Sequence, residues 1–201
     1  TKGALPLWLS PKQINIIHLS VLQKITIFVH IENQCIMADV VKIASYICMR
    51  YQQQYCKEID EMKLHKLLYF TQRESIIQTG EPLFEDCFES WKYGPVRVSI
   101  RQKYRDNALH EELSPETIKN YKSVFDMVFE TYAQKDSWSL SSITHGEYAW
   151  QKARQKVTAE SQHVLIITDD IREDAERVKI RRFIYEKANS LMTKTNDHAN
   201  N

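Results

Sequence analysis

The chain has 201 residues, enough for one domain with an ordinary buried core, or for one domain with an appendage. Its 27 Lys and Arg residues nearly balance its 26 Asp and Glu residues. Net charge therefore gives no argument for a nucleic-acid partner or for an anionic membrane. Only 4 glycines and 5 prolines, among many Lys, Glu, Gln and Ile residues, favour helix over sheet.

The chain contains four cysteines: Cys35, Cys48, Cys56 and Cys87. They form no C-x-x-C pair and no usual zinc spacing, so we expect free thiols in a reducing cytoplasm. No apolar run reaches the roughly 18 residues that a membrane helix needs. The stretch that comes nearest, 14–31, is interrupted by polar residues and lacks the features of a signal peptide. We therefore expect a cytoplasmic protein with no membrane partner.

Residues 1–36 differ from the rest because they are rich in Ile, Leu and Val, have strand propensity and carry few charges. Within them, the motif Leu-Pro-Leu-Trp-Leu-x-Pro-x-Gln, from Leu5 to Gln13, resembles the start of the anticodon-binding domain of threonyl-tRNA synthetases. Nothing later in the chain continues this resemblance, so it implies no synthetase function. We expect the functional domain to begin at Met37. The alternative is that 1–36 is a genuine extension that selects a partner.

After Met37, apolar residues recur at helical spacing. These residues are Val40, Ile43, Ala44, Ile47, Cys48 and Tyr51. Asp60 is a suitable N-cap for a second helix that runs to about Thr79 and stops at Gly80. The segment 83–93 is predicted to be extended, as a short hairpin.

Gly94 and Pro95 are predicted to end this extended segment. Glycine takes backbone angles closed to other residues, and proline fixes its own φ and lacks an N–H. Because proline is favoured at the first position of a helix, Pro95 is predicted to open a third helix through about Asn107.

The second half of the chain is also predicted to be mainly helical. Ser114 followed by Pro115 predicts a helix that runs to about Tyr132. Ser137 is the expected cap of a shorter helix that ends near Thr144. Then follow a short helix with Trp150, a short strand at 164–167, and a long helix capped by Thr168. The expected divisions are an extension at 1–36, a domain at 37–190 and a disordered tail at 191–201. The predicted fold class is mainly α, a compact multi-helix domain with a short β-hairpin or small sheet.

The sequence offers little for catalysis. The histidines are scattered without H-x-x-x-H or H-E-x-x-H spacing, so neither a metal nor another cofactor is expected. A nucleophilic pair of Cys87 and His145, assisted by Glu89 or Glu147, is conceivable. Sequence alone does not show that these residues meet, and a packed thiol beside a structural histidine is the simpler interpretation.

Large aromatic residues are the better candidates, because they are enriched at the energetic centres of protein interfaces. The candidates are Trp91, Tyr93, Trp138, Tyr148 and Trp150. Each is alternatively a core residue. Trp91 and Tyr93 alternate in an extended segment, which predicts that they share one face.

Nucleic-acid binding is a weaker alternative. Arg97, Arg101, Lys103 and Arg105 give the third helix a basic side. Basic charge beside aromatic residues is how single strands are held. A charged helix side is more often a solvated face, and the chain has no overall basic excess.

Several motifs together resemble one family. They are Met62–Phe70 (MKLHKLLYF), Gly80–Phe84 (G-x-P-L-F), Phe88–Val96 (FESWKYGPV), Leu140–Arg154 (LSSITHGEYAWQKAR) and Asp169–Ile171. In this order they are similar to the motifs of the Panacea domain, also called the SocA-like antitoxin or phage-associated GepA-like domain. The resemblance spans about 38–185. It departs from the family between His145 and Trp150, where Gly-Glu-Tyr-Ala replaces small residues and a proline.

The resemblance implies an antitoxin of a type II-like toxin–antitoxin system, which neutralises a toxin from a neighbouring gene by direct contact. One branch of the family instead delivers its toxin to a Clp-type protease. The partner-binding residues expected from the resemblance and from the aromatic pattern are Trp91, Tyr93, His145 and Trp150, with Glu89 and Lys92 at the edge. The alternatives are an enzyme that uses the region of His145 and Glu89, and a DNA-binding autoregulator. The toxin and the oligomeric state stay open.

Overall fold

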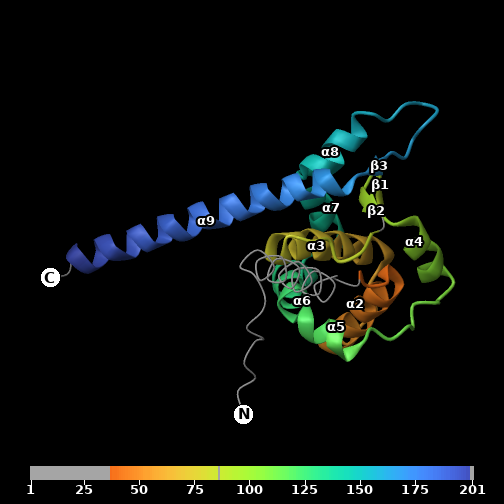
Figure 1. Cartoon of the computed structure of the whole chain (residues 1–201), viewed down its shortest axis with the longest axis horizontal. Helices are drawn as coiled ribbons and strands as arrows, with labels where there is room; N and C mark the ends of the chain where they lie inside the picture. The colour runs from red at the N-terminus through yellow and green to blue at the C-terminus, as the bar shows by residue number, and fades with distance from the viewer. Residues whose placement is uncertain (1–36, 86, 200–201) are drawn as a thin grey trace, which may run out of the picture. The chain divides into compact units, whose positions relative to one another are not determined.

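The structure is a computed structural model, which describes residues 37–85 and 87–199, and side chains as far as Ser190 (Figure 1). The chain divides into two units, Thr1–Ile36 and Met37–Asn201, and the description concerns the second. The synthetase-like motif and Cys35 lie outside the described residues, and the expected domain boundaries stay predictions.

The described part is mainly helical with one small sheet, which confirms the predicted fold class. Its elements are α2 (Val40–Tyr55), α3 (Glu61–Thr79), β1 (Phe88–Trp91), β2 (Gly94–Val96), α4 (Val98–Arg105), α5 (Pro115–Asn120), α6 (Lys122–Val128), η1 (Phe129–Ala133, a π-helix), α7 (Ser137–His145), α8 (Tyr148–Arg154), β3 (Leu165–Ile166) and α9 (Thr168–Ala199). The sheet is antiparallel with the order β2-β1-β3.

Helix α3 is the centre of the domain. It packs against α2, α6, α7, α9 and the hairpin, and it is buried on every side from Lys63 to Ile76. Its ends are as predicted. Asp60 accepts a hydrogen bond from the backbone N–H of Lys63 at 2.9 Å, and Gly80 ends the helix in the left-handed conformation at φ +81°. Such capping supplies partners for backbone groups that the helix itself leaves unpaired.

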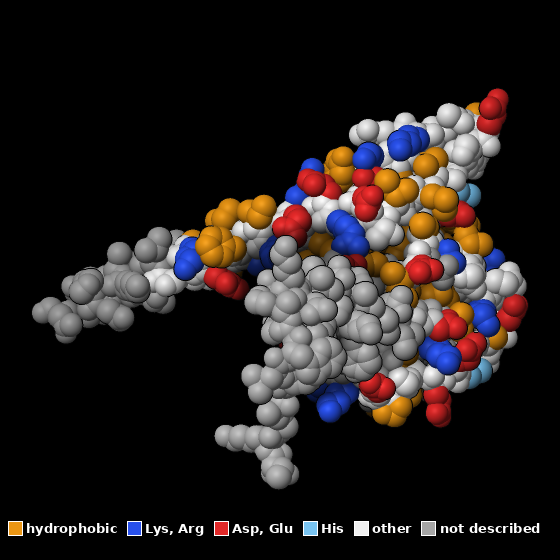
Figure 2. Space-filling model, viewed as in Figure 1, with side chains coloured by type: hydrophobic (Ala, Val, Ile, Leu, Met, Phe, Trp, Pro, Cys, Tyr) orange, Lys and Arg blue, Asp and Glu red, His pale blue; other side chains and the backbone are white. Residues whose placement is uncertain are grey.

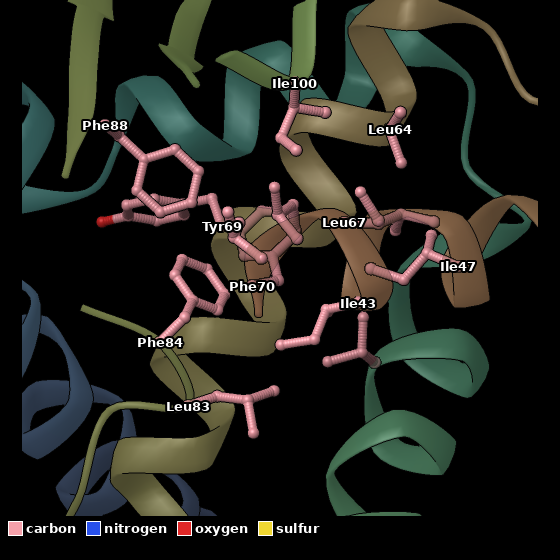
Figure 3. Close-up of a cluster of buried hydrophobic side chains, with 14 of the residues drawn as sticks. Ile43, Ile47, Leu64, Leu67, Tyr69, Phe70, Leu83, Phe84, Phe88 and Ile100 are labelled. Carbon is pink, nitrogen blue, oxygen red and sulfur yellow. The ribbon is translucent and has the colours of Figure 1, made fainter. Parts of the chain in front are cut away.

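The hydrophobic core forms around this helix (Figure 3). Ile43 and Ile47 of α2, two residues of the predicted stripe, are fully buried against it. Phe70 stacks on Tyr132 with ring centroids 4.0 Å apart, and Phe88 brings the sheet into the same cluster. Burying a side chain of this size contributes roughly 1.5–3 kcal/mol, so the core fixes the elements that carry the surface described below.

The prediction that Pro95 opens a helix is wrong. Gly94 and Pro95 form β2 with Val96, and α4 begins only at Val98. Gly94 has φ +104°, which allows the chain to reverse after Trp91. A proline is tolerated here because β2 is an edge strand and needs no N–H on its outer side.

Two further boundaries differ from the prediction. The helix expected to run unbroken to Tyr132 starts at Pro115 as predicted, but is divided into α5, α6 and η1. The cap of α7 is Asp136, not Ser137, and its carboxylate accepts from the backbone N–H groups of Trp138 and Ser139. Asp and Ser are similar caps, so adjacent candidates are hard to separate from sequence.

Helix α9 places Ile171 and Ala175 in the core, as predicted, and Val178 is half-buried. It also includes positions 191–199, which the sequence analysis assigns to a tail; the tail assignment stays a prediction. Among the described residues, no helix is long and apolar enough to cross a membrane.

Candidate partner-binding surface

Three groups of contacting side chains, together called the hairpin patch, lie around the turn between β1 and β2. The patch comprises Glu89, Trp91, Lys92, Tyr93, Trp138, His145, Trp150 and His163. They come from the hairpin, from α7 and α8, and from the loop before β3. The structure therefore brings together all six predicted partner-binding residues and adds Trp138 and His163.

Trp91 is half-buried and held by three neighbours. Its indole Nε1 donates to Glu89 Oε2 at 2.8 Å, and its ring stacks on His163 at 4.2 Å between centroids. The guanidinium of Arg101 lies 4.7 Å from the centroid of the same ring. These contacts fix the orientation of an aromatic side chain before any partner arrives, which reduces the entropic cost of binding.

Trp150 connects the hairpin to α8. Its Nε1 donates to the backbone carbonyl of Trp91 at 3.0 Å, and its ring stacks on His145 at 4.2 Å. Burial lowers the pKa of His145, a hydrogen bond with the Lys92 backbone opposes this, and the positive charge of Lys66 lowers the pKa further. The imidazole is therefore mostly neutral near pH 7, which suits a stacked, half-buried ring.

Tyr93 and Trp138 form an exposed aromatic pair within the patch. Their rings meet edge to face at 5.4 Å, and 47% of Tyr93 and 62% of Trp138 are exposed. The prediction that Trp91 and Tyr93 share the face of one strand rests on a wrong assumption, because β1 ends at Trp91 and Tyr93 lies in the turn. The Trp91 ring contacts His163 and Arg101, whereas the Tyr93 ring contacts Trp138.

A buried lysine lies directly beneath this turn. Lys66, only 1% exposed, donates from Nζ to the carbonyl of Pro95 at 3.1 Å. Burial lowers its pKa to about 7, although the charge of Asp60 opposes the change. A Cβ at Gly94 would lie 2.5 Å from Thr144 Oγ1 and 2.7 Å from Lys66 Cε, so this position accepts only glycine. Periodicity gave no sign of this contact, because lysines are almost never fully buried.

Helix α8 is positioned by a residue that lies far away in the sequence. Asp174 of α9 accepts from the backbone N–H groups of Tyr148 at 2.7 Å and Ala149 at 2.8 Å, and so caps α8. The residue in the N-cap position, Glu147, points inward and pairs with the buried Arg73. Helix α9 therefore fixes α8, and with it Trp150 of the hairpin patch.

The described residues show neither the Cys–His nucleophilic pair nor a metal site. In the described part of the chain, no hydrogen bond joins His145 to Cys87 or Glu89, and no group of His, Cys, Asp or Glu residues is placed to hold a metal ion. Cys48, Cys56 and Cys87 are free thiols, as predicted.

The basic side of α4 is largely neutralised. Arg101 and Arg105 both pair with Glu61, at 2.9 and 3.2 Å, and Lys103 lies 3.6 Å from Glu111. A helix side that has its own carboxylate partners has less positive potential to offer a phosphate backbone. The structure gives the nucleic-acid alternative no support.

One exposed apolar surface, in the middle of α9, was not predicted from the sequence (Figure 2). It contains Ile180, Phe183, Ile184 and Tyr185, all more than half exposed. The spacing i, i+3, i+4 of the first three was available in the sequence as a signal, on the helix side opposite the predicted inward residues.

Residues 64–151 match the family model of the antitoxin SocA-like Panacea domain. The predicted resemblance is thereby confirmed. The matched region begins in α3, includes the hairpin and α4 to α7, and ends within α8. It holds every residue of the hairpin patch except His163.

One curated relative is Antitoxin SocA of Caulobacter vibrioides (strain NA1000 / CB15N). It is 25% identical over 103 residues, which cover 43% of this chain and 55% of the relative. The chain thus spans about half the length of the curated relative that it matches. No solved structure matches the chain. Residues 64–151 are therefore similar to the Panacea domain of SocA-like antitoxins.

Proposed function

We propose that this protein is the antitoxin of a type II-like toxin–antitoxin system. It binds the toxin encoded by a neighbouring gene directly and neutralises it in the cytoplasm. The observation that carries the proposal is the match to the SocA-like Panacea family over the residues that build the hairpin patch.

The hairpin patch has the composition of a protein-binding surface. Interface centres are enriched in Trp and Tyr, and the surrounding rim is polar. Here Trp150 stacks on His145 and reaches the Trp91 backbone, and Trp138 meets Tyr93 edge to face. The charged Glu89 and Lys92 contact the Trp91 indole and the Tyr93 ring. The rings are already held in place by one another and by the backbone, so little additional ordering is needed on binding.

Binding accounts for this arrangement without a catalytic step. The Glu89 carboxylate accepts from the Trp91 indole, and the His145 ring stacks on Trp150, so both groups serve to position aromatic rings. An antitoxin of this kind titrates its toxin in a fixed ratio. An enzyme would act below that ratio, which a titration of toxin activity distinguishes.

The test is co-expression with the neighbouring gene under an inducible promoter. The wild-type chain should restore growth, while Trp91→Ala and Trp138→Ala should fail to restore it and should bind the purified toxin at least about tenfold more weakly. Val98→Ala is the matched control, since Val98 is an exposed apolar residue outside the patch. Circular dichroism confirms that each variant is folded.

Three outcomes would contradict parts of the proposal. A harmless neighbour that does not bind removes the antitoxin function. Full rescue by both tryptophan variants shows that the hairpin patch is not the binding surface. Faster toxin decay that requires a Clp-type protease favours the adaptor alternative over simple inhibition. Comparing residues 37–201 with the whole chain shows whether 1–36 takes part.

A further inference from the structure

The middle of α9 carries an apolar stripe of three side chains. Ile180, Phe183 and Ile184 are 58%, 59% and 61% exposed. At 100° per residue they occupy one side of the helix, opposite the side on which Ile171 and Ala175 enter the core. The core therefore leaves this side, here called the α9 stripe, free for another contact.

The helix is firmly held where the stripe begins. The guanidinium of Arg182 donates to both carboxylate oxygens of Glu74, at 2.9 and 2.8 Å, and the Glu74 side chain is only 1% exposed. A bidentate, largely desolvated pair of this kind is strong and directional. The stripe is thus carried by a helix anchored to α3, which gives it a fixed orientation.

Leaving such a stripe in water is unfavourable. Contiguous exposed apolar side chains on a soluble protein usually mark an interaction site. A helix in a protein also gains most of its stability by burying an apolar face, rather than from its own propensity. Figure 2 shows the hydrophobic side chains gathered along α9 as it leaves the helical body. Both arguments indicate that a partner covers the stripe.

The charges around the stripe indicate the chemistry of that partner. In the segment 177–190, Arg177 pairs with Glu173, Lys179 with Glu176 and Arg182 with Glu74. Arg181 and Lys187 stand outside these ion pairs, beside one acidic residue of the segment, Glu186. Lys187 Nζ lies 5.5 Å from the centroid of the Phe183 ring, so positive charge borders the stripe itself. A second copy of this helix would bring like charges together. A surface bordered by carboxylates would be complementary.

We propose that the toxin takes the α9 stripe into an apolar groove bordered by Asp or Glu side chains, as a second contact besides the hairpin patch. The proposal rests on the proposed antitoxin function. It assigns to α9 the helix-in-groove mode, in which residues at i, i+3 and i+4 are the anchors. Helix α9 lies outside the region that matches the family model, so this contact belongs to the chain's own part of the interface.

The test measures the affinity of the full chain for the purified product of the neighbouring gene by calorimetry. Replacing Phe183 and Ile184 together by Ser should raise Kd at least tenfold, because two anchors are removed. The matched control is Val98→Ser, an exposed apolar residue on α4, which should leave Kd unchanged.

A second pair of variants tests the charge complementarity. Lys187→Glu should raise Kd by about three- to tenfold at low salt, and this loss should shrink as salt increases. Lys119→Glu, an exposed charge reversal on α5, is the control and should have no effect.

Each outcome either supports or overturns the inference. Wild-type chain that does not bind the toxin overturns both the inference and the antitoxin function. Wild-type binding that the double Ser variant retains in full overturns only the inference. The inference alone is also overturned if the double variant keeps its affinity for the toxin but loses self-association or binding to phosphatidylserine vesicles.

Discussion

Lys66 is predicted to make this domain more stable at alkaline pH than near pH 7. It is a lysine buried in the centre of the protein, and its Nζ donates only to the Pro95 carbonyl among the described groups. The charge of Asp60 raises the pKa of Lys66, and the charge of Lys66 lowers the pKa of His65 and of His145. Removing the amine while keeping the apolar stem, as in Lys66→Met, isolates its contribution.

The magnitude follows from the pKa. Burial lowers the pKa of Lys66 from 10.5 to about 7, so the unfolded chain binds more protons than the folded chain between these two values. Stability therefore rises with pH across this window. The part of the unfolding free energy that depends on Lys66 is fully present above pH 10.5 and is lost as the pH falls to about 7. At about 1.4 kcal/mol for each pKa difference of one, it is roughly 4–5 kcal/mol.

Lys66→Met also leaves the Pro95 carbonyl without its donor, which costs about 1–3 kcal/mol at every pH. The variant should therefore be more stable than the wild type by roughly 1–4 kcal/mol at pH 6, because a buried charge is removed. Near pH 10 it should be equally stable or less stable, because the wild-type amine is then neutral.

Urea unfolding followed by far-ultraviolet circular dichroism, repeated from pH 6 to pH 10, measures both free energies of unfolding. The other titrating groups are shared by the two proteins, so the difference between the curves reports Lys66. Two parallel curves, with the variant equally far below the wild type at every pH, would refute the reasoning. They would show that Lys66 keeps an ordinary pKa in the folded protein.

Three other substitutions test how the hairpin patch is supported. Gly94→Ala should cost more than about 2 kcal/mol and weaken toxin binding, because a Cβ there collides with Thr144 at φ +104°; urea unfolding and calorimetry measure the two effects. Glu147→Gln should cost about 3–5 kcal/mol in unfolding free energy, because it leaves the buried Arg73 without its carboxylate. Asp174→Ala should cost about 1–2 kcal/mol and speed hydrogen exchange of the first amides of α8, since it removes their cap. Exchange unchanged from the wild type would contradict that assignment.

Local chemistry determined much of this protein. Asp60 and Gly80 set the ends of α3, as the sequence predicted, because a cap is satisfied by atoms within four residues of it. The apolar stripe of α2 was equally visible, since a helix repeats its core-facing positions every three or four residues. The motifs from Met62 to Arg154 were sufficient to recognise the family.

Where local signals were ambiguous, the prediction failed. The Gly94-Pro95 pair is compatible with the start of a helix or with a strand at a sheet edge. The choice depended on pairing with β1, whose other neighbour, β3, lies about 70 residues further along the chain. Such a pairing has no signature within the hairpin itself.

The support of the candidate surface was decided only by tertiary structure. Lys66 reaches Pro95, Asp174 caps α8, and Arg182 fixes α9 on Glu74, in each case across more than 20 residues of sequence. The side chains involved are of polar or charged types that a sequence pattern assigns to the solvent. Their burial becomes favourable only when a distant segment supplies the hydrogen-bonding partner. The sequence by itself therefore specified the helices and the resemblance to the family, while the packing around α3 decided which aromatic and charged groups meet at the hairpin patch.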